Sequence, residues 1–111
     1  MLLFTVHTLP SGRRVRVRLP QRGDLPGLLA LHDRAGRAIS DLDARRLLRY
    51  DPRSRAVVCA TAWVDGAETL VGFAAAVPGQ EPGPLLADEA HAPGVTGVLR
   101  TSVREYLSRV A

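Results

Sequence analysis

Hydrophobic and polar residues alternate strictly in the segment 13–19, which places valines and a leucine on one face and Arg14, Arg16 and Arg18 on the other. This period of two predicts a β-strand with one buried face. Residues 4–9 read as a preceding strand, and the Pro10-Ser11-Gly12 sequence between the two is typical of a turn. The two segments predict an N-terminal hairpin with a basic outer face. That face is either a solvated edge that resists aggregation or a surface for an anion or a partner.

A second hairpin is predicted in the middle of the chain. Residues 55–64 are an almost continuous apolar run, which is typical of a strand buried on both faces. Asp65-Gly66 is a strong hairpin-turn signal, and residues 68–77 are the expected antiparallel partner. Small residues around Gly72 leave room beside the backbone for a packed helix or a ligand. A Pro/Gly loop at 78–84 then leads to a short further strand at 85–88.

Three segments carry the period of a helix. The first begins at Asp24 as the N-cap and ends near Gly36, and His32 on its apolar stripe is interpreted as a core-edge histidine rather than a base. The second is capped by Ser40 or Asp41 and stops at Asp51-Pro52. The third runs from about Gly94 to the C-terminus. The apolar side expected for the second helix comprises Leu42, Leu47, Leu48 and Tyr50. The apolar side expected for the third helix comprises Val95, Val98, Leu99, Val103, Tyr106, Leu107 and Val110.

The order of these elements predicts an α+β fold. A mostly antiparallel, twisted sheet would combine the N-terminal hairpin with a three-strand meander, and the helices would pack on its faces. The 111 residues, 46% of them apolar, are expected to form a single domain spanning 1–111. No apolar run approaches the roughly 20 residues of a membrane span, and the start of the chain does not read as a signal peptide. A cytoplasmic protein without a membrane partner is therefore expected.

Charge and cysteine content narrow the function classes further. The net charge is +4, and all fifteen cationic residues are arginines spread along the chain. Nucleic-acid binding is not expected, because no aromatic residue interleaves with the arginines of the N-terminal hairpin. Cys59 lies in an apolar run, cannot form a disulfide within the chain, and is interpreted as a small core residue.

The join before the last helix is the segment most indicative of a ligand. An apolar run at 84–87 becomes acidic at Asp88-Glu89 and passes through a Pro/Gly turn into the helix. A glycine-containing turn that opens a helix presents backbone N–H groups to a phosphate. Asp88, Glu89 and His91 are the candidate catalytic bases here. The alternative is that the two acids are solvated loop residues placed favourably before a helix N-terminus. No metal site is expected.

From Val15 onward, the order of elements resembles the GCN5-related N-acetyltransferase (GNAT) fold. In that family a strand, two helices and a three-strand meander lead to a helix whose N-terminal turn binds the pyrophosphate of acetyl-CoA. Two local sequences carry the likeness. Residues 15–26 are similar to the family's first strand and the Asp that opens its first helix. Residues 58–74 are similar to its second hairpin, where an acidic-Gly turn is followed by Leu-Val-Gly-Phe.

The family's pyrophosphate motif is Gln or Arg, two residues, Gly, one residue, and Gly or Ala, with a leucine three positions further on. In the register that begins at His91, Gly94 and Leu99 match, whereas His91 and Thr96 depart from the motif. Pro93 also removes one backbone N–H from the turn. The resemblance implies that the cofactor contacts Ala92, Gly94, Val95, Thr96 and Gly97.

The resemblance implies an acyl-CoA-dependent N-acyltransferase, with acetyl-CoA as cofactor, or an acyl-CoA binder. The alternative is a non-catalytic GNAT-like module for dimerisation or protein interaction. The likeness covers residues 13–111 here and only the front part of the family fold, which continues with another strand and helix. A homo-oligomer or a second chain that completes the fold is therefore the expected partner.

Overall fold

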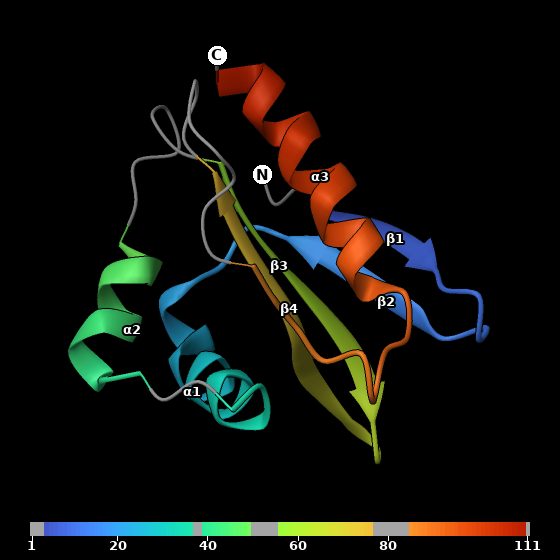
Figure 1. The fold of residues 1–111 in the computed structure, drawn as a ribbon, viewed down its shortest axis with the longest axis horizontal. Helices are drawn as coiled ribbons and strands as arrows, with labels where there is room; N and C mark the ends of the chain where they lie inside the picture. The colour runs from blue at the N-terminus through green and yellow to red at the C-terminus, as the bar shows by residue number, and fades with distance from the viewer. Residues whose placement is uncertain (1–3, 37–38, 50–55, 77–84, 111) are drawn as a thin grey trace.

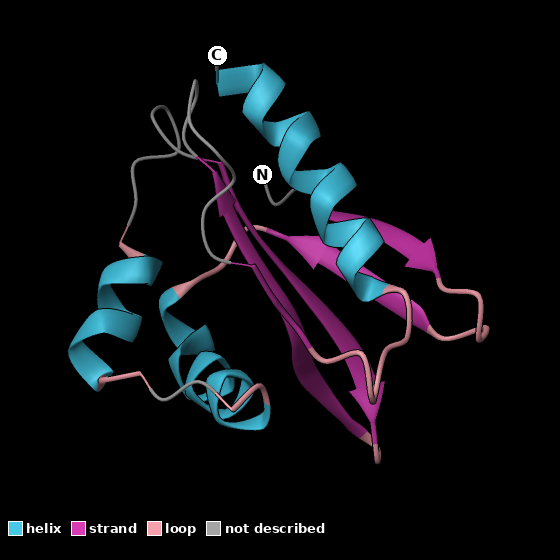
Figure 2. Ribbon diagram, viewed as in Figure 1, coloured by secondary structure: helices cyan, strands magenta, loops and turns pink. Residues whose placement is uncertain are grey.

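The computed structural model describes residues 4–36, 39–49, 56–76 and 85–110. The strands form one five-stranded sheet whose order follows the chain: β1 (Phe4–Thr8), β2 (Arg14–Arg18), β3 (Ala56–Val64), β4 (Ala67–Ala76) and β5 (Leu85–Ala87). Every neighbouring pair is antiparallel. Figures 1 and 2 show the twist between the β1–β2 hairpin and the β3–β4 hairpin. The predicted hairpin and meander are both confirmed.

Helices cover both faces of this sheet (Figure 1). α1 (Leu25–Arg34) and α2 (Asp41–Leu48) pack on one face, and α3 (Val95–Val110) packs on the other. A short 3-10 helix, η1 (Arg22–Asp24), leads into α1. The α+β class is thus confirmed. None of the helices in the described ranges is long and apolar enough to cross a membrane.

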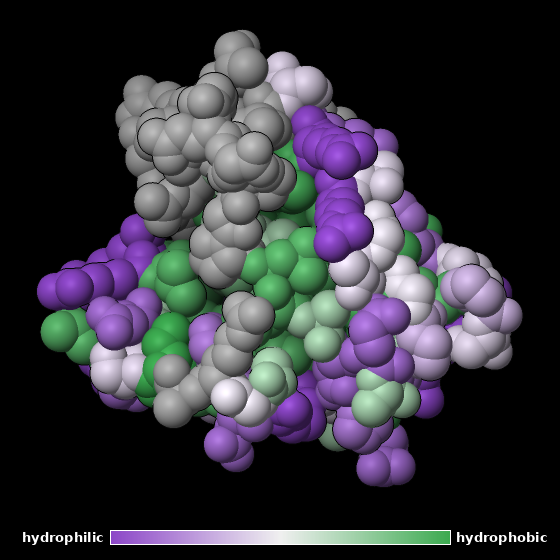
Figure 3. Space-filling model, in the orientation of Figure 1, coloured by the Kyte–Doolittle hydropathy of each residue, from purple (hydrophilic) through white to green (hydrophobic). Residues whose placement is uncertain are grey.

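The core has two layers because β3 and β4 are buried on both faces. Val58 and Val71 pack toward α3, whereas Val57, Cys59 and Phe73 pack toward α1 and α2. Burial raises the pKa of the Cys59 thiol to about 12, so Cys59 behaves as the predicted core residue. On the surface seen in Figure 3, apolar side chains gather between the α1–α2 side and α3.

Two glycine positions fix how the strands turn and pack. Asp65 and Gly66 both have positive φ angles, of 51° and 80°, which is the type I′ geometry of a tight hairpin. At Gly72, an added Cβ would lie 2.6 Å from a methyl group of Leu99 on α3. The space that the sequence left for a helix or a ligand is therefore filled by α3.

The first helix begins where predicted but is not capped as predicted. Asp24 occupies the N-cap position of α1, yet its side chain accepts no capping hydrogen bond there. Its carboxylate instead accepts two bonds from the Arg18 guanidinium, at 2.7 and 2.8 Å, and one from the Gln21 N–H, at 2.6 Å. A bidentate arginine competes effectively with a backbone N–H for a carboxylate, so the predicted cap is wrong. His32 is buried and its Nδ1 lies 3.0 Å from the Leu28 carbonyl oxygen, as a core histidine would.

The second helix is capped by Ser40, whose hydroxyl accepts a bond from the Asp43 N–H at 3.1 Å. Leu42 was expected on its apolar side, but it is 58% exposed, and that prediction is wrong. The inward stripe is formed by Ala44, Leu47 and Leu48, and a residue two positions before Ala44 lies on the opposite face of a helix. The expected stop at Asp51-Pro52, Tyr50 and the loop at 78–84 lie outside the described residues.

Candidate functional site

The join between β5 and α3 is anchored on an irregularity of the sheet. The pairing of β3 with β4 shifts register between Ala60 and Thr61, which leaves Val71 as an extra residue in β4. The Val71 carbonyl oxygen accepts a hydrogen bond from the Asp88 N–H at 2.8 Å. Two further turns follow, with bonds from the Ala92 N–H to the Asp88 carbonyl (2.9 Å) and from the Val95 N–H to the Ala92 carbonyl (3.1 Å). The bulged strand therefore positions the start of the loop that opens α3.

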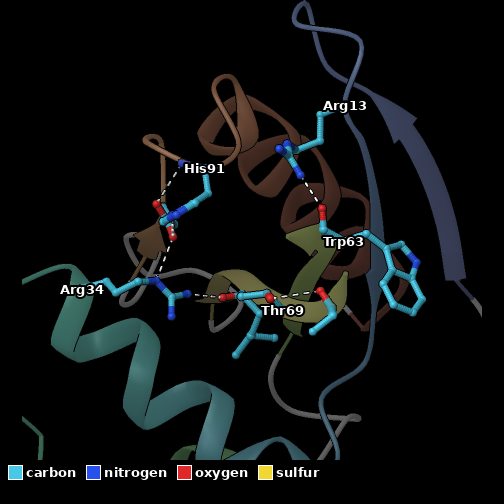
Figure 4. A network of polar contacts seen from close by, with 8 residues as sticks. Arg13, Arg34, Trp63, Thr69 and His91 are labelled. Carbon is cyan, nitrogen blue, oxygen red and sulfur yellow. Dashed lines mark hydrogen bonds and ion pairs between the residues drawn. The ribbon is translucent and has the colours of Figure 1, made fainter. Parts of the chain in front are cut away.

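Asp88 is the buried centre of this join, with a side chain only 5% exposed. Its carboxylate accepts bonds from Arg34 Nε (2.8 Å), the His91 N–H (3.1 Å) and the His91 ring (2.8 Å), as Figure 4 shows. Arg34, at the end of α1, also donates to the Leu70 carbonyl oxygen at 2.6 Å. Burial alone would raise the pKa of Asp88, but the bonds from His91 and Arg34 outweigh it and hold that pKa below its usual range. Asp88 is therefore ionised at neutral pH and accepts hydrogen bonds only.

His91 is held by this carboxylate yet remains open to solvent, with 45% of its side chain exposed. Because an ionised carboxylate cannot donate, the proton between the two groups lies on His91 Nδ1, and Nε2 of the neutral ring is an acceptor. A histidine oriented in this way can take a proton from a bound molecule. It lines an open cavity of about 450 Å³ together with Ser11, Arg13, Ala90 and Pro93.

Glu89 points the opposite way, over the turn that opens α3. One carboxylate oxygen accepts a bond from the Gly94 N–H at 3.1 Å. The other accepts bonds from the Thr96 N–H and the Thr96 hydroxyl, both at 3.0 Å. These bonds, that from Gly94 first, hold the pKa of Glu89 below its usual range. With both carboxyl groups ionised and engaged, His91 is the best placed of the three predicted bases.

The residues predicted to contact a cofactor therefore divide into three kinds. Gly94 and Thr96 aim their donors outward at a single oxoanion. Ala92 and Val95 are buried. The Ala92 N–H donates to the Asp88 carbonyl, whereas the Val95 N–H donates to the Ala92 carbonyl and also helps to lower the pKa of Glu89. Gly97 is exposed in the first turn of α3, with open space around its Cα.

The N-terminal hairpin packs directly against this turn. Gly94 has a φ of 96°, and an added Cβ would lie 3.1 Å from Pro10 and 3.7 Å from Leu9, in the turn between β1 and β2. A side chain at position 94 would therefore be strained by the backbone and crowded by the hairpin. Arg13, from the same hairpin, donates to the Trp63 carbonyl oxygen on β3 (Figure 4).

Three contributors to the site could not be found from sequence patterns. Arg34 bonds to Asp88 from 54 positions away in the sequence, and Ser11 and Arg13 line the same cavity as His91 from about 80 positions away. The positive charges of Arg34 and Arg13 were the only sequence feature that could point to the site, and they do not distinguish these two residues from the thirteen other arginines. Within the described part of the chain, no three His, Cys, Asp or Glu side chains come together as metal ligands.

A second hollow lies on the part of the sheet that faces away from α3, beside β1. It is about 280 Å³ in volume, and its rim carries two exposed apolar side chains, Trp63 (68%) and Val6 (55%). Arg14, Arg16 and Glu68 also line it. The fold thus brings Trp63 beside Arg14 and Arg16, although no aromatic residue interleaves with these arginines in the sequence.

Comparison with known proteins supports the fold and no more. No family model and no curated protein matches this sequence. Among solved structures, the fold is similar to the crystal structure of the GNAT domain of S. lividans PAT, with a TM-score of 0.75 over 96% of this chain and 73% of that chain. The two are 18% identical. The chain therefore has a GNAT-like fold, as its sequence resemblance implied.

Proposed function

We propose that this chain binds an acyl-CoA, with the pyrophosphate held by the turn at 94–96. The observation that carries the proposal is the convergence of three donors, from Gly94 and Thr96, on the two oxygens of one carboxylate. A carboxylate is a fair stand-in for a phosphate edge, because both present two negatively charged acceptors at hydrogen-bonding distance. The turn thus has the donor chemistry that a pyrophosphate needs, at the positive end of α3.

Acyl transfer to an amine is the activity that fits the neighbouring residues. Bound acetyl-CoA would supply an activated thioester acyl group: the bond between the acyl carbon and sulfur would break as the amide bond forms, and CoA would leave as a thiolate that takes up the proton lost by the amine. His91 would accept the proton that the attacking amine must lose, through Nε2, while Asp88 holds the ring and balances its charge. Asp88 and Glu89 would not serve as the base, because their low pKa values make them weak proton acceptors.

The second candidate is a non-catalytic interaction module, which the hollow beneath Trp63 favours. Two exposed apolar side chains beside arginines are typical of a protein contact. A homo-oligomer or another chain would then be the partner. One measurement distinguishes the two candidate functions: whether the protein binds a CoA compound.

Calorimetry of the purified protein with acetyl-CoA tests the proposal. Binding below millimolar concentration is expected. The variant Thr96→Glu adds a carboxylate to the donor turn and should weaken that binding at least tenfold. Thr101→Glu adds the same charge to an exposed position further along α3 and should weaken it less than twofold. Gly94 is a poorer site for substitution, since any side chain there also disturbs the packing of Pro10. Absence of binding at millimolar acetyl-CoA would overturn the proposal and favour the interaction module.

A further inference from the structure

Glu89 occupies the same donors that a phosphate ligand would need. Its carboxylate spans the turn, with one oxygen on the Gly94 N–H and the other on both donors of Thr96. An ordinary N-cap residue directly precedes the first helical turn and satisfies an N–H two or three residues ahead. Glu89 instead accepts bonds from residues five and seven positions ahead, Gly94 and Thr96. The loop between β5 and α3 therefore folds the Glu89 carboxylate back onto the start of the helix.

The neighbouring acid explains why Glu89 can adopt this position. Asp88 is turned toward the protein interior by Arg34 and His91, and its carboxylate also accepts the His91 N–H. This arrangement fixes the loop to the protein interior through Asp88 and leaves the Glu89 side chain on the solvent-exposed surface. Glu89 is exposed, so its side chain can rotate into solvent without disturbing the core.

We infer that Glu89 is a built-in competitor for the phosphate site, which closes the turn in the free protein and must swing away before an anionic ligand binds. This inference rests on the proposed function and concerns the regulation of the same site. When a side chain of the protein occupies a binding site, an external ligand can bind only the fraction of molecules in which the site is free, and its apparent affinity falls in proportion to that fraction. It also leaves a negative charge close to the incoming phosphate. Removing the carboxylate is therefore expected to tighten anion binding.

The matched variants are Glu89→Gln and Glu105→Gln. Both remove one negative charge, but Glu105 is exposed further along α3, away from the turn. Titration with inorganic pyrophosphate and with acetyl-CoA at low salt is expected to show about tenfold tighter binding for Glu89→Gln. Glu105→Gln should change affinity less than twofold. Glu89→Asp keeps the charge but shortens the side chain, and it should also bind more tightly because the carboxylate no longer reaches the donors of both Gly94 and Thr96.

A second measurement detects the contact of Glu89 with Gly94 and Thr96 in the absence of any ligand. The backbone amide resonances of Gly94 and Thr96 should shift with pH in the wild-type protein as Glu89 titrates, below the ordinary pKa of a glutamate. Asp88, His91 and Arg13 are the other ionisable groups that face this loop, and comparison with Glu89→Gln separates their contribution from that of Glu89. The Glu89 component should vanish in Glu89→Gln and persist in Glu105→Gln.

The outcomes separate the inference from the proposed function. If Glu89→Gln binds pyrophosphate more tightly but neither protein binds acetyl-CoA, the competitor stands and the proposed function fails. If wild type and Glu89→Gln bind acetyl-CoA equally, the function stands and the competitor is overturned. The competitor is also overturned if Glu89→Gln, shown to be folded by its amide spectrum, binds no pyrophosphate at all. The same holds if the Gly94 and Thr96 amides do not respond to Glu89.

Discussion

The ion pair between Arg34 and Asp88 links the end of α1 to the join between β5 and α3, and removing it should destabilise the folded protein. Arg34 makes two bonds of 2.8 and 2.6 Å, one to Asp88 and one to the carbonyl of buried Leu70. The variant Arg34→Met keeps the apolar stem and removes both bonds. It leaves Asp88 with one donor fewer and the Leu70 carbonyl without this partner.

The expected magnitude lies between that of a surface pair and that of a buried one. Exposed pairs contribute about 0–1 kcal/mol, whereas breaking a fully buried pair costs about 3–5 kcal/mol. Here the Asp88 side chain is 5% exposed and the Arg34 side chain 31%, so solvent screens one partner. Arg34→Met should therefore lower the free energy of unfolding by about 2 kcal/mol, and its coupling to Asp88→Asn should be about 1 kcal/mol.

Urea denaturation of the two single variants and the double variant measures that coupling. The chain offers a matched control in Arg45 and Asp41, which pair at 2.9 Å with side chains 60% and 57% exposed. Their coupling should not exceed about 0.5 kcal/mol. If the two couplings are equal, burial of Asp88 does not strengthen its pair, and the reasoning is refuted.

Acid should remove this stabilisation in a defined direction. The pKa of Asp88 is lower in the folded protein than in the unfolded chain, so the folded state favours the ionised carboxylate. The contribution is fully present above the unfolded pKa of about 3.9 and is lost as pH falls through the folded value. Asp88→Asn should therefore show a shallower loss of stability with acid than the wild-type protein.

Three further predictions concern the core and the exposed sheet face. Gly72→Ala should lower the free energy of unfolding by about 1–2 kcal/mol in urea, because its methyl group would meet Leu99 at 2.6 Å in a filled core; unchanged stability would mean that α3 shifts without cost. Cys59 should resist alkylation in the folded protein and react only at the rate of unfolding, because the thiol is buried with a pKa of about 12; rapid labelling under native conditions would contradict this. Trp63 is the single tryptophan and is 68% exposed, so its fluorescence should be quenched almost fully by acrylamide in the free protein and protected when a partner covers the hollow; weak quenching of the free monomer would show that the hollow is already covered.

The sheet could be predicted because each of its strands carries a local sequence pattern. Alternation in 13–19, the apolar run in 55–64 and the Asp65-Gly66 turn depend only on neighbouring residues. The third helix was found for the same reason. Leu42 was placed wrongly because a helix of eight residues offers several apolar stripes, and only the contact with the sheet selects one.

The site was harder to predict because its polar contacts cross the fold. Sequence spacing located Asp88, Glu89 and His91 but treated the two acids as equivalent. In the structure the two side chains point in opposite directions, because Arg34 at the end of α1 binds the Asp88 carboxylate on the interior side. Glu89 then remains outside, where it closes the turn that its neighbours open. No local pattern encodes that division of roles.

The order of the five strands in the sheet is also their order in the chain. During synthesis on the ribosome, each strand can therefore add to the edge left by the one before it, without waiting for a distant segment to be made. The last described element, α3, is the exception, because it covers valines that leave the ribosome some 80 residues earlier, on β2. Until α3 is released, that face of the nascent sheet is open to water. A nascent chain stalled before α3 should thus be the form most prone to aggregate or to recruit chaperones.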